Sequence, residues 1–212
     1  MIKSIDQLDP GKRYTYADYL TWQFQERVEL ILGKIFRMSP APKTAHQQVL
    51  MKLSSSLYNK LKGNGCQVFP APFDVRLPIK GSKKNEKIDT VIQPDISVVC
   101  DPSKLDEKGC IGAPDLIIEI VSRSSVRKDL HDKYDIYEWA GVKEYWVVHP
   151  IDKTVMKYTL HNGKYQPSRL LTLGDVVESD VLKGYSVSLD DTFSGMVGED
   201  DDVEYEKSIR RI

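Results

Sequence analysis

Cysteine and histidine are scarce in this chain. Its three cysteines, Cys66, Cys100 and Cys110, form no Cys-x-x-Cys pair, and its four histidines are scattered. This spacing argues against a zinc-finger type of site and against a histidine-rich metal centre. Because sparse, unpaired cysteines are typical of reducing compartments, we expect all three to be reduced thiols.

Long apolar runs are also missing. No uninterrupted apolar run is longer than about four residues, whereas a membrane-spanning helix needs about 20. The residues after Met1 do not show the basic segment followed by an apolar segment that is typical of a secretory signal peptide. We therefore expect a cytoplasmic protein with no membrane partner. The length of 212 residues suits one domain, predicted at 1–197.

The chain carries almost no net charge. The formal value is −1, which argues against a generic nucleic-acid binder. Residues 198–212 carry −3 and the body carries +2, so we expect 198–212 to be a flexible acidic tail that could shield a basic cleft. The basic residues of the body gather in the segments PIKGSKKNEK and RSSVRK, which read as solvated loops or as phosphate contacts.

Hydrophobic periodicity predicts an α+β fold in which helices flank a mixed β-sheet as an α/β/α core, with additional β-hairpins. Thr44 is the expected N-cap of the helix predicted at 44–61, and Gly141 is expected to end the helix predicted at 125–140. Helices are predicted at 16–22, 44–61 and 125–140, and a hairpin with its turn at Gly33 is predicted at 26–38. Strands are predicted at 66–69, 73–77, 96–100, 115–122 and 144–150, and further hairpins are predicted from 154 to about 195.

A glutamate interrupts the most apolar of these strands. In the segment LIIEIV, Glu119 shares one strand face with Ile117 and Val121. Burying an ionised carboxylate costs several kcal/mol unless it is paired, protonated or bound to a cation. Glu119 is therefore a candidate functional residue. The structural alternative is a carboxylate at a strand end or one paired with an arginine.

A lysine lies on the apolar stripe of the helix that follows this strand. On a helical wheel, Lys133 falls within about 60° of Leu130, together with Tyr137. One interpretation is that the aliphatic stem of Lys133 is buried while its ammonium lies in water. The other is that the ammonium contacts Glu119 or the group that Glu119 binds. Two unusual residues in consecutive elements favour the second interpretation.

Two further acids lie in β-prone segments. Asp95 directly follows Pro94, where aspartate is also a common turn residue. Glu29 has apolar neighbours, and Arg27 is an alternative partner for it. If these acids and Lys133 converge, the carboxylates suit a hard cation such as Mg²⁺. The lysine would stabilise charge on an attacked phosphate or steady the attacking water.

Several stretches resemble the Uma-type restriction endonuclease family, small bacterial proteins of largely uncharacterised biology within the PD-(D/E)XK nuclease superfamily. The resemblance spans roughly residues 14–195. It is carried by the segments ELILGKIFRMSPAP, QPDISVV, APDLIIEIVSRSS and DLHDKYDIYEWAGVKEYWVVHP.

The resemblance implies a restriction-endonuclease-like fold and Mg²⁺-dependent phosphodiester hydrolysis, with Mn²⁺ as a substitute. Asp95 and Glu119 would bind the metal, with the backbone carbonyl of Ile120 as a third ligand. Val121 stands where the superfamily usually has its lysine. The family resembled here has a lysine on the following helix instead, and Lys133 matches it.

Two other residues match recurrent positions of the family. Glu29 matches an early acid that would tune or extend the metal site. His46 matches a position of unassigned role and is an accessory candidate. Asp115, in a second Pro-Asp pair, is an alternative to Asp95 as a metal ligand. It lies about 13 Å along the strand from Glu119, which is too far for the two carboxylates to share one ion easily.

These residues predict a metal-dependent endonuclease that cleaves DNA. Its expected catalytic residues are Asp95, Glu119, Lys133 and Glu29. A non-catalytic DNA-binding or assembly module on the same scaffold is the alternative. A hydrolase of small phosphoesters is a weaker one, because the chain has no glycine-rich nucleotide loop. By analogy with nucleases that cut two strands, the C-terminal third could form a homodimer interface.

Overall fold

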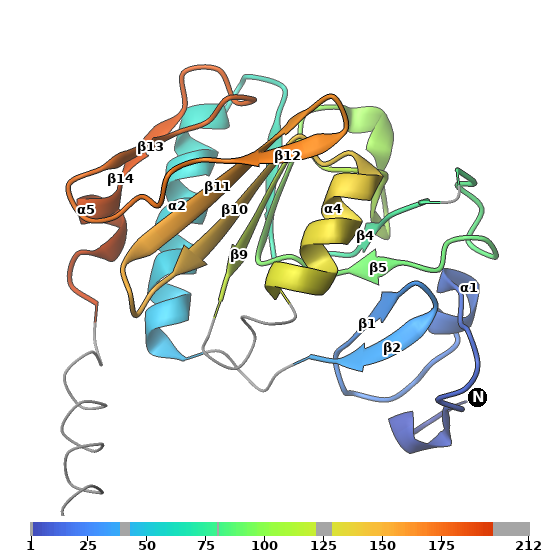
Figure 1. The fold of residues 1–212 in the computed structure, drawn as a ribbon. Helices are drawn as coiled ribbons and strands as arrows, with labels where there is room; N and C mark the ends of the chain where they lie inside the picture. Colours follow the sequence, from blue (N-terminus) through green and yellow to red (C-terminus); the bar gives the residue numbers. More distant parts are fainter. Residues whose placement is uncertain (1, 39–42, 80, 122–128, 197–212) are drawn as a thin grey trace, which may run out of the picture.

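The computed structural model describes residues 2–38, 43–79, 81–121 and 129–196 (Figure 1). The predicted acidic tail at 198–212 and the predicted start of the last helix at 125 lie outside these residues. Within them, the strands form two six-stranded sheets and one two-stranded sheet. Helices accompany the sheets, so the predicted α+β class is confirmed.

The central sheet carries the apolar strand predicted at 115–122. That strand, β9 (Leu116–Ile120), is buried along its whole length, and it pairs in parallel with β10 (Glu144–His149) and antiparallel with β6 (Ile96–Val99). A strand that is buried on both faces belongs in the middle of a covered sheet, as the sequence predicts. The spatial order of the central sheet is β12 (Lys164–Pro167), β11 (Thr154–His161), β10 (Glu144–His149), β9 (Leu116–Ile120), β6 (Ile96–Val99) and β3 (Gln67–Pro70).

The lateral sheet begins with the predicted hairpin. Its turn places Leu32 at φ 49° and Gly33 at φ 80°, and a left-handed conformation of this kind favours glycine. The short strands after the hairpin, apart from the one at 73–77, were not predicted. The spatial order of the lateral sheet is β2 (Lys34–Arg37), β1 (Val28–Ile31), β5 (Val91–Ile92), β4 (Val75–Arg76), β8 (Gly109–Ile111) and β7 (Leu105–Asp106).

The long helix α2 (Thr44–Leu61) has the predicted bounds. Its buried residues repeat with the expected spacing and include Val49, Leu53 and Leu57. The predicted cap is wrong, because the N-cap is Lys43, which makes no side-chain capping bond. The remaining helical segments are η1 (Ile5–Gln7), α1 (Tyr16–Tyr19), η2 (Pro102–Lys104), the π-helical η3 (Asp129–Lys133), α4 (Tyr134–Ala140) and α5 (Leu189–Phe193).

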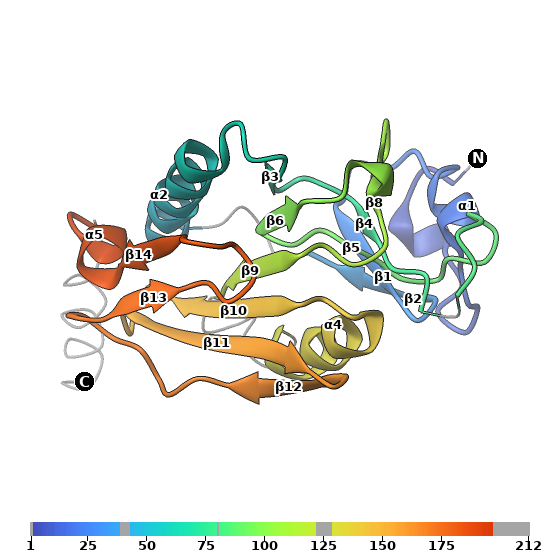
Figure 2. The same ribbon diagram turned by 90° about the horizontal axis from the view of Figure 1, so that it is seen from above.

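The central sheet lies between two helices (Figure 2). On one face, Ile96, Ile118 and Ile120 pack in one apolar cluster with the buried side chains of α2. On the other face, Ile117 and Val147 pack with α4 and with residues of the lateral sheet in a second cluster. The lateral sheet therefore adjoins the α4 face of the central sheet. Glu119, which alternates with Ile118 and Ile120, points toward this second face.

The last helix and the C-terminal segment follow the prediction in part. Gly141 ends α4 with φ 84°, as expected. The predicted hairpins after residue 154 are present as β11–β12 and as β13 (Val176–Glu178) paired with β14 (Ser186–Ser188). The helix α5 was not predicted. Ser188 caps it by accepting a hydrogen bond from the backbone of Asp191.

Two cysteines contradict the expected free thiols. Cys66 and Cys100 form a disulfide across 34 residues of sequence. They extend the register in which Gln67 pairs with Val99, so the sheet places them opposite each other although no local motif signals the pairing. Cys110 is free and buried. Among the residues that the structure describes, no helix is both long and apolar enough to cross a membrane.

Candidate functional site

The pairing of β6 with β9 determines where two candidate acids meet. Ile96 pairs with Ile118 in this antiparallel ladder, and Asp95 and Glu119 are the next residues of the two chains beyond this pair. Asp95 directly precedes β6, and its carboxylate accepts a hydrogen bond from the backbone N–H of Ile120, the residue after Glu119.

Glu119 is buried and receives hydrogen bonds from the helix packed above it. The ammonium of Lys133 lies 2.8 Å from Oε1 of Glu119, and the hydroxyl of Tyr137 donates to the same oxygen at 2.6 Å. The exposed fraction is only 3% for Glu119 and 4% for Lys133. The expected contact between the two is therefore present, and Lys133 does not extend into water.

Glu29 is the second carboxylate at Lys133. Its Oε1 lies 3.1 Å from the lysine ammonium and accepts a hydrogen bond from the backbone N–H of Gln93 at 3.3 Å. Arg27, the alternative partner, instead donates to the side chain of Gln93. Lys133 thus joins a glutamate of the lateral sheet to one of the central sheet.

Tyr137 remains protonated in this environment. Its side chain is fully buried, and burial, followed by the nearby negative charge of Glu119, raises the pKa of the phenol well above its ordinary value. A phenol that does not ionise can only donate to the carboxylate. Tyr137 therefore fixes the orientation of Glu119 without adding charge.

Asp95 has its own set of partners. Its Oδ2 accepts a hydrogen bond from the backbone N–H of Ile120 at 2.8 Å, and its Oδ1 lies 3.2 Å from Nε2 of His46. Asp95 thus contacts both Ile120 and His46, two other residues singled out in the sequence. Nδ1 of His46 is buried and has no hydrogen-bond partner in the part of the chain that the structure describes.

Asp115, the rival of Asp95, is engaged elsewhere. Its Oδ2 accepts a hydrogen bond from the backbone N–H of Cys100 at 2.8 Å, and its Oδ1 lies 2.6 Å from the ammonium of Lys143. These contacts hold the opposite end of β9. Asp115 is therefore not part of the group around Glu119.

Two residues at the site were not proposed from the sequence. Tyr137 lies one turn after Lys133 on the buried stripe of the helix, and this spacing is the signal in the sequence for a second donor to Glu119. Gln93 gave no such signal. Its side chain accepts from Arg27 and donates to Asp74 at 2.8 Å, which anchors the segment that joins β5 to β6.

The carboxylates of the site suit a magnesium ion by their chemistry. Mg²⁺ binds through one or two carboxylates and completes its coordination with water and substrate phosphate oxygens. Asp95, directly before β6, and Glu119, in the adjacent β9, are carboxylates of this chemical type. A larger all-protein cage is not found: no group of three or more His, Cys, Asp or Glu side chains in the described ranges could hold a metal ion. The contact of Glu29 at this site is the one with Lys133 described above.

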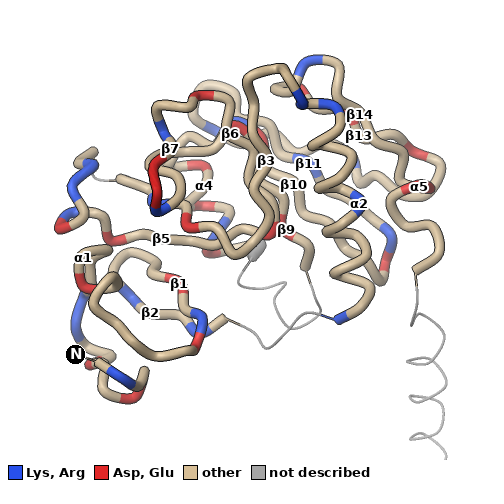
Figure 3. Tube along the Cα trace, turned by 180° about the vertical axis from the view of Figure 1, so that it is seen from behind, with Lys and Arg blue, Asp and Glu red and all other residues tan. Residues whose placement is uncertain are grey.

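Charges of both signs are interspersed around these elements. In the view of Figure 3, lysines and arginines alternate with aspartates and glutamates along the chain. This matches the near-neutral net charge.

The comparisons with known proteins agree with this architecture. A crystal structure of a "putative nuclease belonging to DUF820" from Anabaena variabilis superposes with a TM-score of 0.66 at 22% identity, covering 85% of this chain and 98% of that one. This likeness establishes the fold and confirms the predicted restriction-endonuclease-like architecture.

A sequence relative and a family model extend the comparison. The uncharacterized protein slr1290 of Synechocystis is 27% identical over 130 residues, a match that covers 60% of this chain and 64% of the relative. The model of the Uma2 family, described as "Putative restriction endonuclease", matches residues 16–190. This match covers most of the chain, and the protein therefore belongs to the Uma2 family.

Proposed function

We propose that this protein is a metal-dependent endonuclease that hydrolyses phosphodiester bonds in DNA. The observation that carries the proposal is the buried Lys133, which contacts the carboxylates of both Glu29 and Glu119. Buried charges clustered in this way are costly for stability and are characteristic of catalytic sites.

Each residue has a distinct part in the proposed chemistry. Asp95 and Glu119 would hold Mg²⁺, or Mn²⁺ in its place, with the carbonyl of Ile120 as a further ligand. The ion would supply positive charge to the phosphate under attack. Lys133 would orient the attacking water and stabilise the charge that develops on the phosphate. Glu29 keeps Lys133 in place, and His46 supports Asp95.

The alternative is a DNA-binding or assembly module that does not catalyse. The near-neutral charge of the chain favours it, because a nuclease usually presents a basic groove. The complete set of acids and lysine favours the enzyme. The two proposals differ in whether a divalent ion is needed for any effect on DNA.

Calorimetric titration with Mn²⁺ or Mg²⁺ tests the proposal without knowledge of the substrate sequence. Wild type should bind the ion, and Glu119→Gln should lose binding while thermal melts show a folded protein. Glu178→Gln is the matched control, because Glu178 is an exposed glutamate of β13. Cleavage of mixed-sequence DNA is then assayed with the same three proteins.

The outcomes separate the two functions. Metal binding and cleavage that are lost together in Glu119→Gln support the enzyme. DNA binding that is unchanged by the ion or by its removal, without cleavage, supports the module. Because substrate phosphate can complete the coordination of a weak site, a wild-type protein that binds no ion even with DNA present would contradict the nuclease.

A further inference from the structure

An exposed arginine lies next to the buried charges of the site. Arg27 directly precedes β1, and its carbonyl accepts a hydrogen bond from the backbone N–H of Met38 at 2.9 Å. That bond extends the β1–β2 ladder, in which Val28 pairs with Arg37, by one residue. Arg27 is therefore in extended conformation and lies on the same face of the hairpin as Glu29, about 7 Å along the strand from it.

The guanidinium of Arg27 is held in place although it is exposed. Its Nε and Nη2 donate to Oε1 of Gln93, at 3.2 Å and 2.8 Å. The amide of Gln93 is fixed in turn by Asp74, to which its Nε2 donates at 2.8 Å. Most exposed arginines are free to adopt many rotamers, so this anchoring removes much of the entropy cost of binding a ligand.

The rest of the guanidinium is available. No carboxylate within the described ranges pairs with Arg27, and its two bonds to Gln93 leave Nη1 without a described partner. The backbone N–H of the same Gln93 donates to Glu29, which contacts Lys133. One residue thus connects the exposed cation to the buried cluster, with Pro94 and Asp95 following it directly.

We propose that Arg27 binds a phosphate of the nucleic-acid backbone next to the scissile bond, an inference that rests on the proposed function. Arginine suits this role because its planar guanidinium donates two parallel hydrogen bonds to phosphate oxygens and is always charged. Its contact positions the strand at the site and is independent of base sequence. Arg27 is a binding residue and takes no part in bond cleavage.

The salt dependence of DNA binding provides the test. The full-length protein is titrated onto a mixed-sequence fluorescent duplex, in EDTA so that no cleavage occurs, at several salt concentrations. Loss of one phosphate contact lowers the slope of log K against log salt by about 0.9. Arg27→Ala should show this change, with affinity falling about tenfold at low salt, and should melt at the wild-type temperature.

Two further variants make the test specific. Arg37→Ala removes an exposed arginine of the same hairpin, which pairs with Asp6 at 2.7 Å and, being opposite Val28, lies on the other face. It should leave the slope unchanged. Arg27→Lys keeps the charge and loses the fixed guanidinium, so it should retain the wild-type slope with an affinity between those of wild type and Arg27→Ala.

Several outcomes would overturn the inference. One is an equal loss of slope in Arg27→Ala and Arg37→Ala. Another is Arg27→Lys behaving as Arg27→Ala. Absence of DNA binding by the wild type would also refute it, whereas the metal titration of Glu119→Gln decides separately on the proposed function. Failure of the phosphate contact is thus distinguishable from failure of the nuclease.

Discussion

Two glutamates buried in neighbouring strands of the central sheet have different kinds of partner. Glu144 of β10 is 0% exposed, and Glu119 of β9 is 3% exposed. The carboxylate of Glu144 accepts hydrogen bonds from the indole of Trp146 at 2.5 Å and from two backbone amides, those of Asp180 at 2.7 Å and Val181 at 3.1 Å. The hydroxyl of Ser179 also donates to it, at 3.2 Å.

The donors show what each carboxylate does. Glu144 binds neutral groups, two of them in the backbone of one loop, so it holds the segment before β14 against the sheet. Glu119 receives an ammonium and a phenol from residues one helical turn apart. An ammonium can stabilise the negative charge that develops on a phosphate under attack. An indole or a backbone amide that already holds a loop in place is not available for this role. Burial alone therefore does not distinguish a structural acid from a candidate catalytic one.

The first prediction concerns the structural member of the pair. Glu144→Ala should lower the free energy of unfolding by about 3–5 kcal/mol, because it leaves several buried donors without an acceptor at about 1–3 kcal/mol each, partly relieved by entering water. Urea denaturation with a constant m-value measures the loss. Glu178→Ala, an exposed glutamate in the adjoining β13, should change stability by less than about 0.5 kcal/mol. A loss below about 1 kcal/mol in Glu144→Ala would show that water replaces the carboxylate.

The second prediction separates Lys133 from the acids it contacts. Lys133→Met should keep the divalent ion, since the carboxylates remain, while cleavage of DNA falls about 10²–10³-fold, a loss typical of removing one charge-stabilising donor. It should also lose some stability, because its buried carboxylates lose a cation. Metal titration and cleavage rates are therefore measured at a temperature at which the variant is folded.

A surface lysine supplies the control for this change. Lys143 pairs with Asp115 at 2.6 Å, but its side chain is 59% exposed. Lys143→Met should leave cleavage unchanged and cost less than about 1 kcal/mol, as is usual for exposed ion pairs. If Lys133→Met loses the metal together with cleavage, the lysine organises the carboxylates instead of acting on the phosphate.

Much of the fold could be predicted because its longest elements have strong periodic patterns. The apolar stripe of α2 and the mostly apolar residues of β9 each predict one type of element, and Gly33 and Gly141 mark turns that need positive φ. The two-residue strands β5 and β7, which were not predicted, are too short to show a pattern. The disulfide between Cys66 and Cys100 depends on strand register, which no local spacing reveals.

The candidate site was predictable where a charge interrupts an apolar pattern. Glu119 and Lys133 were found in this way, and the structure brings them into contact. Glu144 was not singled out, because it stands at the start of its strand, where an acid is unremarkable. Gln93 was missed because its role depends on the crossover between two sheets. The sequence therefore did not reveal these contacts between distant segments. The catalytic roles of the site residues stay predictions.

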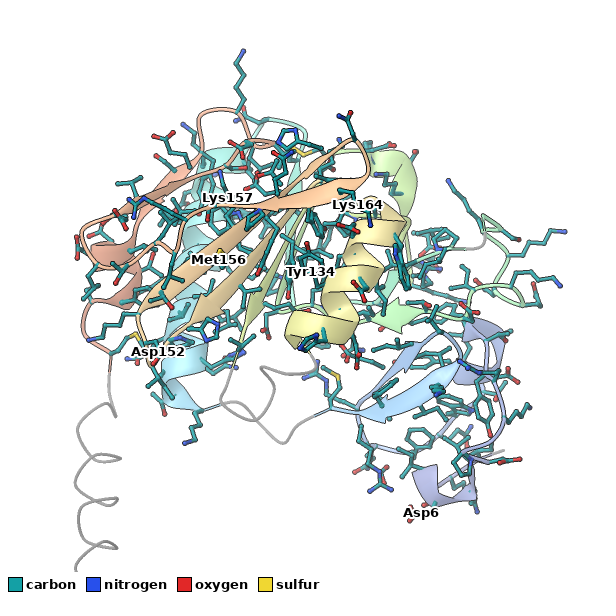
Figure 4. All side chains as sticks on the ribbon, in the orientation of Figure 1. Asp6, Tyr134, Asp152, Met156, Lys157 and Lys164 are labelled. Atoms are coloured by element: carbon teal, nitrogen blue, oxygen red, sulfur yellow. A yellow bond between two sulfur atoms is a disulfide. The ribbon has the colours of Figure 1, made fainter. Side chains whose placement is uncertain are left out.

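The third prediction compares two buried tyrosines. Tyr137 donates to Glu119 at 2.6 Å and Tyr165 donates to the carbonyl of Val142 at 2.9 Å. Both belong to a cluster of aromatic rings in which Tyr134 points from α4 toward the central sheet (Figure 4). Replacing either with phenylalanine removes one hydroxyl and should cost about 1–2 kcal/mol of unfolding free energy.

Only one of these changes should affect the chemistry. Tyr137→Phe should lower kcat for DNA cleavage several-fold with little change in KM, because Glu119 loses the donor that orients it, whereas Tyr165→Phe should leave both constants near the wild-type values. Steady-state kinetics of the two variants, compared at matched fractions of folded protein, measure the difference. Equal effects on kcat would mean that both hydroxyls serve packing alone.

The smallest expected effect concerns the pH dependence of Glu144. Burial raises the pKa of this carboxyl above its ordinary value, although the bonds from Trp146 and the backbone of Asp180 oppose the shift. An acid whose pKa is higher in the folded state stabilises the fold below its unfolded pKa of about 4.3 and loses that contribution as pH rises. Glu144→Gln cannot titrate, so the stability of wild type relative to this variant should fall as the pH rises above the unfolded pKa of about 4.3. Urea denaturation across this range measures the difference, and a relative stability that instead rises with pH would mean that the neutral donors outweigh burial.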